Sequence, residues 1–299
     1  MIGTLAPKSS PWGEVFSCWE KAVPAKSGGS VELEFFYNYG GGQEAPGDAM
    51  RAGRLGGVAA AVSSLGSVYA PLVGLQMPGL LSSWTQVDGP RVDVRREIEG
   101  GAREAGLAIV GWGDLGMVRV LTRGPGPAAP GDLRGRRVRV SPADPIGPAL
   151  CSAIGATPVA VEASAVAKAL EGGLVDVVFA PLVAAESMDW LRHLDQVTDV
   201  VVAPALGCVA LAEGRVSALT VDLRAVLAEA GGAALAGLSS RVRAADDAVL
   251  RRLRERGAVA APRRAELSKW QRLFREVRGD LSRGTLPKEL VRRIEASAR

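Results

Sequence analysis

Four arginine residues stand within the segment DLRGRRVRV, at residues 132–140. A guanidinium group donates a fork of hydrogen bonds that matches a carboxylate or a phosphate, so this segment could recognise an anion. Its last residues alternate valine with arginine, and a spacing of two is typical of a β-strand. Arg137 and Arg139 would then share one face of the strand, and the two valines would share the other.

Arg139 stands next to the carboxyl end of this expected strand. In open parallel α/β sheets, this edge faces the crevice in which ligands bind. We therefore expect Arg139 to clamp a ligand carboxylate; the alternative is a solvated strand edge where Arg139 pairs with Asp144 or another acid. The remaining arginines of the segment are expected on the surface: Arg134, Arg136 and Arg137.

Acid–base catalysis is a competing chemistry, and Glu44, Asp114 and Asp144 could supply its groups. However, the chain has no well-spaced pair of carboxylates, no P-loop and no GxGxxG after a strand. Its single histidine, His193, stands in the polar segment LRHLDQ with no nucleophile nearby, which argues against a Ser-His-Asp or Cys-His site. We expect a binding protein and not an enzyme.

The three cysteines, Cys18, Cys151 and Cys208, form no CxxC motif and no cluster with histidine. A zinc site is therefore not expected, and the sequence implies no other metal and no cofactor. In an oxidising compartment Cys151 and Cys208 could form a disulfide, but buried free thiols are favoured.

The composition is that of a globular protein, with 47% hydrophobic and 23% charged residues. The net charge of +4 is spread along the chain, and aromatic residues do not alternate with basic ones, so nucleic acid is not an expected partner. No apolar run could span a bilayer, and no export signal precedes the first strand. Yet Met1 stands directly on that strand, as it would after removal of a signal peptide or in a shortened gene.

Strand-like and helix-like segments alternate up to residue 211, a rhythm that predicts parallel strands with right-handed crossovers. The expected strands are residues 2–5, 31–39, 56–62, 107–113, 118–124, 136–140, 157–161, 175–181, 199–203 and 207–211. The expected helices between them are residues 12–26, 48–54, 87–105, 148–154 and 164–171.

After Leu219 the pattern becomes helical, with one long helix at about 220–256 and two more at 263–281 and 287–296. We expect two lobes, with the long helix spanning both and a ligand held between them. Lobe I would comprise residues 1–123 with about 206–235, and lobe II would comprise residues 124–205 with about 236–299.

A family resemblance rests on the order of six segments: GTLAPKSSPWGE, FFYNYGGGQE, AMRAGRLGGVAA, DLRGRRVRV, IGATPVAV and ALEGGLVDVVFAP. Over nearly its whole length the chain resembles the extracytoplasmic substrate-binding subunits of TRAP transporters, the DctP-like family. The resemblance implies an α/β, two-lobed type II periplasmic-binding-protein-like fold with a long bridging helix. It also implies a periplasmic protein, whose signal peptide this chain lacks, that delivers a small molecule to TRAP membrane permease subunits.

The family's carboxylate-binding arginine ends the strand after a D-L-[KR]-G turn, which corresponds to Arg139. Another family segment, V-D-G-Q-E-N-P, reads V-D-V-V-F-A-P here, so Ala180 replaces an asparagine that helps to fix the ligand. The loop at residues 63–84 is also rich in leucine, methionine and aromatic residues. These departures resemble the branch of the family with a hydrophobic cleft and a TPR-type periplasmic partner.

The expected ligand is accordingly amphipathic or hydrophobic, lipid-like molecules included, with a carboxylate near Arg139. A small organic acid is the alternative within the same family. The candidate ligand-binding residues come from loops and strand ends expected at the cleft: Trp12, Tyr69, Trp84, Trp112, Asp114, Arg139, Asp144, Phe179 and Ala180.

Overall fold

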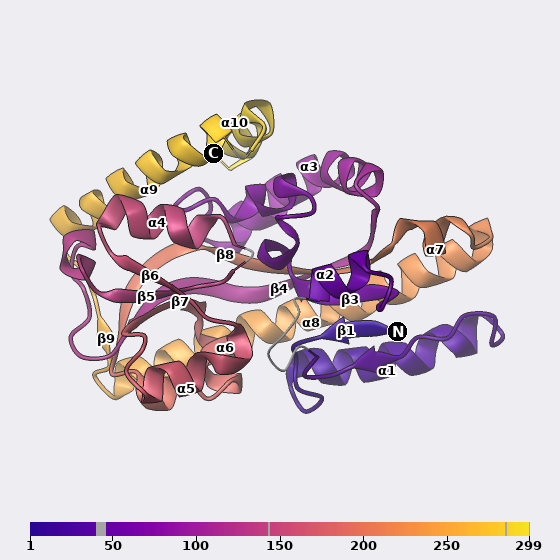
Figure 1. The fold of residues 1–299 in the computed structure, drawn as a ribbon, viewed down its shortest axis with the longest axis horizontal. Coiled ribbons are helices and arrows are strands. Elements are labelled where there is room, and N and C mark those ends of the chain that lie inside the picture. Colours follow the sequence, from indigo (N-terminus) through magenta and orange to yellow (C-terminus); the bar gives the residue numbers. More distant parts are fainter. Residues whose placement is uncertain (40–45, 143, 285, 299) are drawn as a thin grey trace.

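A mixed β-sheet runs through the molecule and carries helices on both faces (Figure 1). The computed structural model describes residues 1–39, 46–142, 144–284 and 286–298, so the candidate acid Glu44 lies outside the described residues. The strands are β1 (Ile2–Thr4), β2 (Phe35–Phe36), β3 (Gly57–Ala61), β4 (Leu107–Thr122), β5 (Arg137–Val140), β6 (Thr157–Ala160), β7 (Val177–Pro181), β8 (Gln196–Ala212) and β9 (Val259–Ala260). Their order is β2-β1-β3-β8-β4-β7-β5-β6, with β9 beside β8.

Two long antiparallel strands, β4 and β8, form the centre of the sheet. The sequence predicted that each would be interrupted, at residues 114–117 and 204–206, and both predictions are wrong because the strands are continuous there. A register shift between Asp114 and Gly116 lets β4 bend without ending, as a β-bulge does. Gly116 accommodates this bend because its φ of 116° is open to glycine and strained for other residues. Each strand therefore continues from the half of the sheet that contains β2, β1 and β3 into the half that contains β7, β5 and β6.

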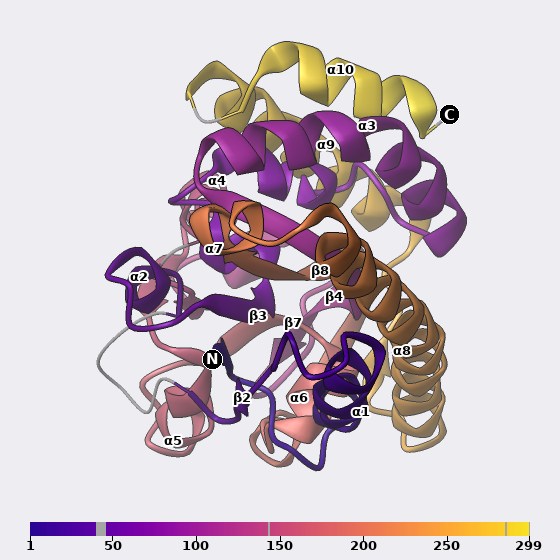
Figure 2. The ribbon, with the colours of Figure 1, turned by 90° about the vertical axis from the view of Figure 1, so that its right-hand side faces the viewer.

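The helices form two groups, one on each face of the sheet (Figure 2). One face carries α3 (Trp84–Glu104), α4 (Ile146–Ile154), α9 (Arg264–Gly284) and α10 (Lys288–Ser297). The other carries α1 (Pro11–Lys26), α5 (Val166–Glu171), α6 (Leu182–Ser187) and α8 (Val221–Glu255), and the short helices α2 (Pro46–Arg51) and α7 (Glu213–Ser217) complete the set. In the part of the chain that the structure describes, no helix has the length and apolarity needed to cross a membrane.

The long helix predicted at about 220–256 is confirmed as α8, which packs along β4 and against α1 and α6. It begins where the Thr220 hydroxyl accepts a hydrogen bond from the N–H of Leu223, a common N-cap. Gly231 lies inside the continuous helix. There it admits the indole of Trp19, since a Cβ at this position would lie 2.8 Å from the ring.

Most of the expected strand at residues 31–39 is not a strand, and only β2 pairs with β1. The N–H of Phe35 donates to a carboxylate oxygen of Glu20 at 2.6 Å. Phe35 pairs with Ile2 in β2, which lies at the edge of the sheet, and this contact gives its N–H a side-chain partner.

Asp246 on α8 joins the helix to the rest of the molecule. Its carboxylate accepts hydrogen bonds from the N–H of Met117 on β4 at 3.1 Å and from the N–H of Val183 on α6 at 3.0 Å. Nη1 of Arg119 donates to it as well, at 3.4 Å. Burial raises the pKa of Asp246, and these donors and the positive charge oppose that effect.

Asp246→Asn is expected to destabilise the fold by about 1–3 kcal/mol, because an amide NH₂ would face a backbone N–H donor and Arg119 would lose a buried partner. Equilibrium unfolding in urea measures the change. Asp247 is the matched control, since it is the next residue on the same helix and is exposed. Asp247→Asn is expected to change the free energy of unfolding by no more than about 0.5 kcal/mol. Equal losses in the two variants would contradict this account of Asp246.

The three cysteines are free, with Cys18 exposed and Cys151 and Cys208 buried. The disulfide considered from the sequence is therefore not formed in this structure. Burial raises the pKa of Cys151 to about 11 and that of Cys208 to about 12, so both side chains are thiols at neutral pH. Only a thiolate reacts readily with disulfide reagents.

Titration of the native protein with an aromatic disulfide reagent at pH 8 is therefore expected to modify Cys18 quickly and the two buried thiols slowly. The absorbance of the released thiolate measures the count, and the unfolded protein should release three equivalents. A Cys18→Ser variant supplies the control, since it should show almost no fast phase. Fast release of more than one equivalent from the native wild type would show that the buried thiols are accessible.

Candidate ligand-binding site

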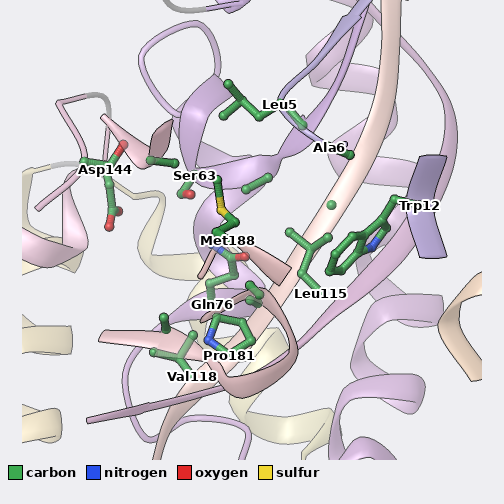
Figure 3. Close-up of a pocket in the computed structure, with 18 of the residues that line it drawn as sticks. Leu5, Ala6, Trp12, Ser63, Gln76, Leu115, Val118, Asp144, Pro181 and Met188 are labelled. Atoms are coloured by element: carbon green, nitrogen blue, oxygen red, sulfur yellow. The ribbon is translucent and has the colours of Figure 1, made fainter. Parts of the chain in front are cut away.

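A cavity of about 310 Å³ lies where the two halves of the sheet meet. One half contributes the segment after β1, the start of α1 and the end of β3 to its lining. The other half contributes the ends of β5 and β7 together with α4 and α6, and β4, β8 and α8 cross between them. In Figure 3, Trp12 and Leu115 lie on one side of the cavity and Asp144 lies on the other. A solute in this cavity would therefore contact both halves.

Most of the cavity wall is apolar. Its large side chains include Leu5, Trp12, Phe16, Leu115, Ile146, Leu150, Phe179, Met188, Trp190, Leu235 and Leu238. The charged residues in the lining of the described part of the chain are Arg139, Asp144 and Glu162. An apolar cavity with a few convergent polar groups is the usual form of a small-molecule site, in which the polar groups orient the ligand.

Arg139 lies at the carboxyl end of β5, as the strand alternation predicted, and it lines the cavity. Its Nε donates to the carbonyl oxygen of Val161 at 2.9 Å, which fixes one edge of the guanidinium. No hydrogen bond or ion pair joins Nη1 or Nη2 to another described residue. Burial lowers the pKa of Arg139 while Asp144 and Glu162 raise it, and arginine stays charged at neutral pH in either environment. The two free nitrogens can therefore donate to a carboxylate.

Asp144 does not form an ion pair with Arg139, although both residues lie in the described part of the chain. Its Oδ1 instead accepts a hydrogen bond from the N–H of Ile146 at 3.0 Å, at the start of α4. Burial raises the pKa of Asp144, and the N–H groups of Ile146 and Gly147 and the charge of Arg139 act in the opposite direction. Asp144 thus supports α4 and leaves the guanidinium available.

Five of the nine candidate residues line the cavity: Trp12, Arg139, Asp144, Phe179 and Ala180. Trp12 belongs to the first turn of α1, and its Nε1 points to the carbonyl oxygen of Asp114 at 3.5 Å. Phe179 and Ala180 belong to β7, the strand in which the sequence departs from its family pattern. The structure thus brings an arginine and an apolar wall together in one cavity.

The other four candidates do not line the cavity, although their segments reach it through Ser63, Gln76, Gly113 and Leu115. Trp112 and Asp114 alternate along β4 with Gly113 and Leu115, and it is the latter pair that lines the cavity. Adjacent residues of a strand tend to point to opposite faces, and Trp112 and Asp114 point to the α3 side, where they contact Glu99 and Arg91. Trp112 donates from Nε1 to Glu99 at 2.8 Å instead.

Tyr69 and Trp84 pack on the α3 side of the sheet. The Tyr69 hydroxyl lies so close to Gly101 of α3 that a Cβ there would be only 1.9 Å away. The ring of Trp84 lies 4.4 Å from the guanidinium carbon of Arg243, a cation–π contact. Both aromatic residues therefore have packing partners of their own.

Asp114 is fully buried in a network of ion pairs. Arg91 on α3 and Arg243 on α8 each donate to it at 2.6 Å, and Asp88 binds both arginines. The hydrogen bond from Arg243 lowers the pKa of Asp88. The network joins α3, β4 and α8, which gives the acid a structural role in place of the predicted ligand contact.

Sequence reasoning missed several lining residues. Leu235 and Leu238 belong to α8, and no local pattern indicates which face of that helix meets the cavity. Glu162 follows β6, and its negative charge raises the pKa of Arg139. Gln76 was the one polar residue in the apolar run LVGLQMPG, and this contrast was the available signal.

The model of the family described as bacterial extracellular solute-binding protein, family 7 (DctP), matches residues 2–281. Because the members of this family are binding proteins, the prediction of a non-enzyme is confirmed.

Solved structures confirm the predicted fold class. A TRAP periplasmic solute-binding protein of Roseobacter denitrificans with bound β-D-glucuronate has a TM-score of 0.89, 17% identity, and coverage of 99% of this chain and 98% of the other. A TRAP periplasmic solute-binding protein of Sulfurospirillum deleyianum with bound succinate has a TM-score of 0.86 and 18% identity, with coverage of 99% of this chain and 97% of the other. A Bordetella pertussis extracytoplasmic solute receptor binding pyroglutamic acid has a TM-score of 0.87 and 17% identity, with coverage of 100% of this chain and 98% of the other. With nearly the whole chain matched by the family model, this protein belongs to the DctP family of bacterial extracellular solute-binding proteins.

Proposed function

We propose that this protein captures a small organic acid in the periplasm and delivers it to the membrane permease of a TRAP-type transporter. The observation that carries the proposal is the guanidinium of Arg139, which lines the cavity with Nη1 and Nη2 free of described partners. The guanidinium is half-buried, and a ligand carboxylate could accept hydrogen bonds from both of these nitrogens. The similar proteins that bind glucuronate, succinate and pyroglutamic acid support this choice.

The size of the cavity also supports a compact ligand. Its volume of about 310 Å³ stands at the lower end of the range of roughly 300–1,000 Å³ for small-molecule sites. The apolar wall adds a preference for a ligand with some hydrocarbon surface, at roughly 25 cal/mol for each Å² removed from water. We infer an acid with its carboxylate at Arg139 and its less polar part against Phe179 and Trp12.

An amphipathic, lipid-like ligand is the second candidate, and the side chains of β7 favour it. Phe179 lines the cavity and Ala180 stands where the family has an asparagine. Membership of the branch with a TPR-type partner would accompany this ligand. Mass spectrometry of solvent extracts from the purified protein separates the candidates, since a retained lipid would favour the second and a small acid the first.

Lobe closure would trap the ligand. In this mechanism the protein exchanges between an open and a closed arrangement of its two predicted lobes, and the ligand favours the closed one. The predicted lobes are residues 1–123 with about 206–235 and residues 124–205 with about 236–299. The strands β4 and β8 cross between the halves and offer the place for bending, at the register shift beside Gly116. No covalent step is needed.

Arg139→Gln is expected to weaken binding of a carboxylate by about 10- to 150-fold, the equivalent of one charge-assisted hydrogen-bonding group. Isothermal titration with the tightest acid from a panel that includes pyroglutamate, succinate and glucuronate measures the change. Arg137→Gln is the matched control, because Arg137 lies on the same strand but is exposed and paired with Asp176. Unchanged affinity in Arg139→Gln, or an equal loss in Arg137→Gln, would refute the carboxylate site.

The same acid is expected to reduce the radius of gyration of the wild-type protein in small-angle X-ray scattering, because both halves line the cavity. Arg139→Gln at the same ligand concentration should keep the profile of the free protein. Superimposable profiles of free and saturated wild type would speak against closure.

A further inference from the structure

Gln76 ends the short 3₁₀ helix η2 (Ala70–Gln76) and points into the cavity (Figure 3). Only 7% of the residue is exposed. Its Oε1 accepts a hydrogen bond of 2.7 Å from the N–H of Leu206, in the middle of β8. The side chain is therefore held on the central strand from the half of the molecule opposite to Arg139.

This hydrogen bond settles the orientation of the amide. A backbone N–H can only donate, so the oxygen of Gln76 must face Leu206 and the nitrogen must face away from it. Nε2 carries two N–H groups and has no hydrogen-bond partner among the described residues. Among the described side chains, Nε2 of Gln76 is not one of the fully buried polar atoms that lack a partner, so it keeps some accessible surface. Its donors are therefore open to the contents of the cavity.

We propose that Gln76 is a specificity-determining residue that donates from Nε2 to a neutral oxygen of the ligand. The ligand would be a hydroxy acid or an oxo acid, with its carboxylate at Arg139 and a hydroxyl or carbonyl oxygen at Gln76. This inference rests on the proposed function and narrows its ligand class. Without such an oxygen, binding an acid would displace water from Nε2 and leave a buried donor unpaired.

The charges of the cavity favour a neutral oxygen over a second carboxylate at Gln76. Arg139 is the only cation in the described lining of the cavity, and the acids Asp144 and Glu162 line it as well. A ligand with two carboxylates would add two negative charges to this set, whereas a hydroxyl or carbonyl group adds none beyond the first carboxylate. An amide donor suits such a neutral acceptor.

Matched pairs of acids test the proposal. Isothermal titration would compare butanoate with 2-, 3- and 4-hydroxybutanoate and with 2-oxobutanoate, and the same set would be repeated with six-carbon chains. Within each pair the carboxylate and the chain length are the same. The measured quantity is the ratio of the dissociation constants of the plain and the oxygenated acid, and for the best pair we expect about tenfold or more in the wild type.

Two variants remove the donor in different ways. Gln76→Glu keeps an acceptor for Leu206 but replaces the NH₂ group by a carboxylate oxygen, and Gln76→Met removes both functions at similar size. Gln76→Met is expected to bring every ratio close to one, and Gln76→Glu is expected to do so for the oxo acid, because a carboxylate can still accept a hydrogen bond from a ligand hydroxyl. The ratio cancels the effect of a new charge on the carboxylate that the two acids share. Ser187→Ala is the control, since Ser187 lines the cavity and its hydroxyl already donates to the carbonyl of Val183 at 2.8 Å.

The outcomes separate this inference from the proposed function. If acids bind in an Arg139-dependent way but the ratio is near one in the wild type, or is unchanged in both Gln76 variants, Gln76 does not select the ligand and the proposed function stands. If no acid of the panel binds, or Arg139→Gln binds as the wild type does, the proposed function fails and this inference fails with it. A ratio that falls only in the Gln76 variants supports the assignment.

Discussion

Two buried carboxylates hold the long helix α8 to the strands that connect the halves of the molecule. Asp114 lies between Arg91 and Arg243, and Asp246 accepts hydrogen bonds from β4 and α6. An ionised group in the interior is stable only with such partners, so the acids and their donors must be placed together. The faces of β4 and α8 that line the cavity depend on this arrangement.

The cavity combines an apolar wall with one arginine that has partners on only one edge. Val161 holds Nε of Arg139, and the remaining nitrogens are left for a solute. In an apolar surrounding, a charge-assisted hydrogen bond is stronger than in water because the local dielectric constant is low. The same wall makes an unmatched polar group costly. Affinity and selectivity would therefore come from a few groups, with Arg139 and Gln76 contributed by opposite halves of the molecule.

Local patterns were sufficient where one neighbouring element decides the position of a residue. The valine–arginine alternation and the carboxyl end of the strand were enough to place Arg139 at the end of β5. The same reasoning failed along β4, where strand continuity through Gly116 decides which residues face the cavity. Taking residues 107–113 and 118–124 as separate strands placed Trp112 and Asp114 at a strand end expected to reach the cleft, whereas both lie within the continuous strand β4.

The sequence by itself determined the α/β alternation, the long helix after Leu219 and the arginine at the end of β5. These features depend on the period of apolar residues and on short motifs, which act over a few residues. The tertiary structure alone decided that Asp114 is a buried ion-pair partner, that Leu235 and Leu238 reach the cavity, and that the Gln76 amide has a fixed orientation. Those properties arise from contacts between segments that lie from 23 to 130 residues apart in the sequence, and no local pattern encodes them.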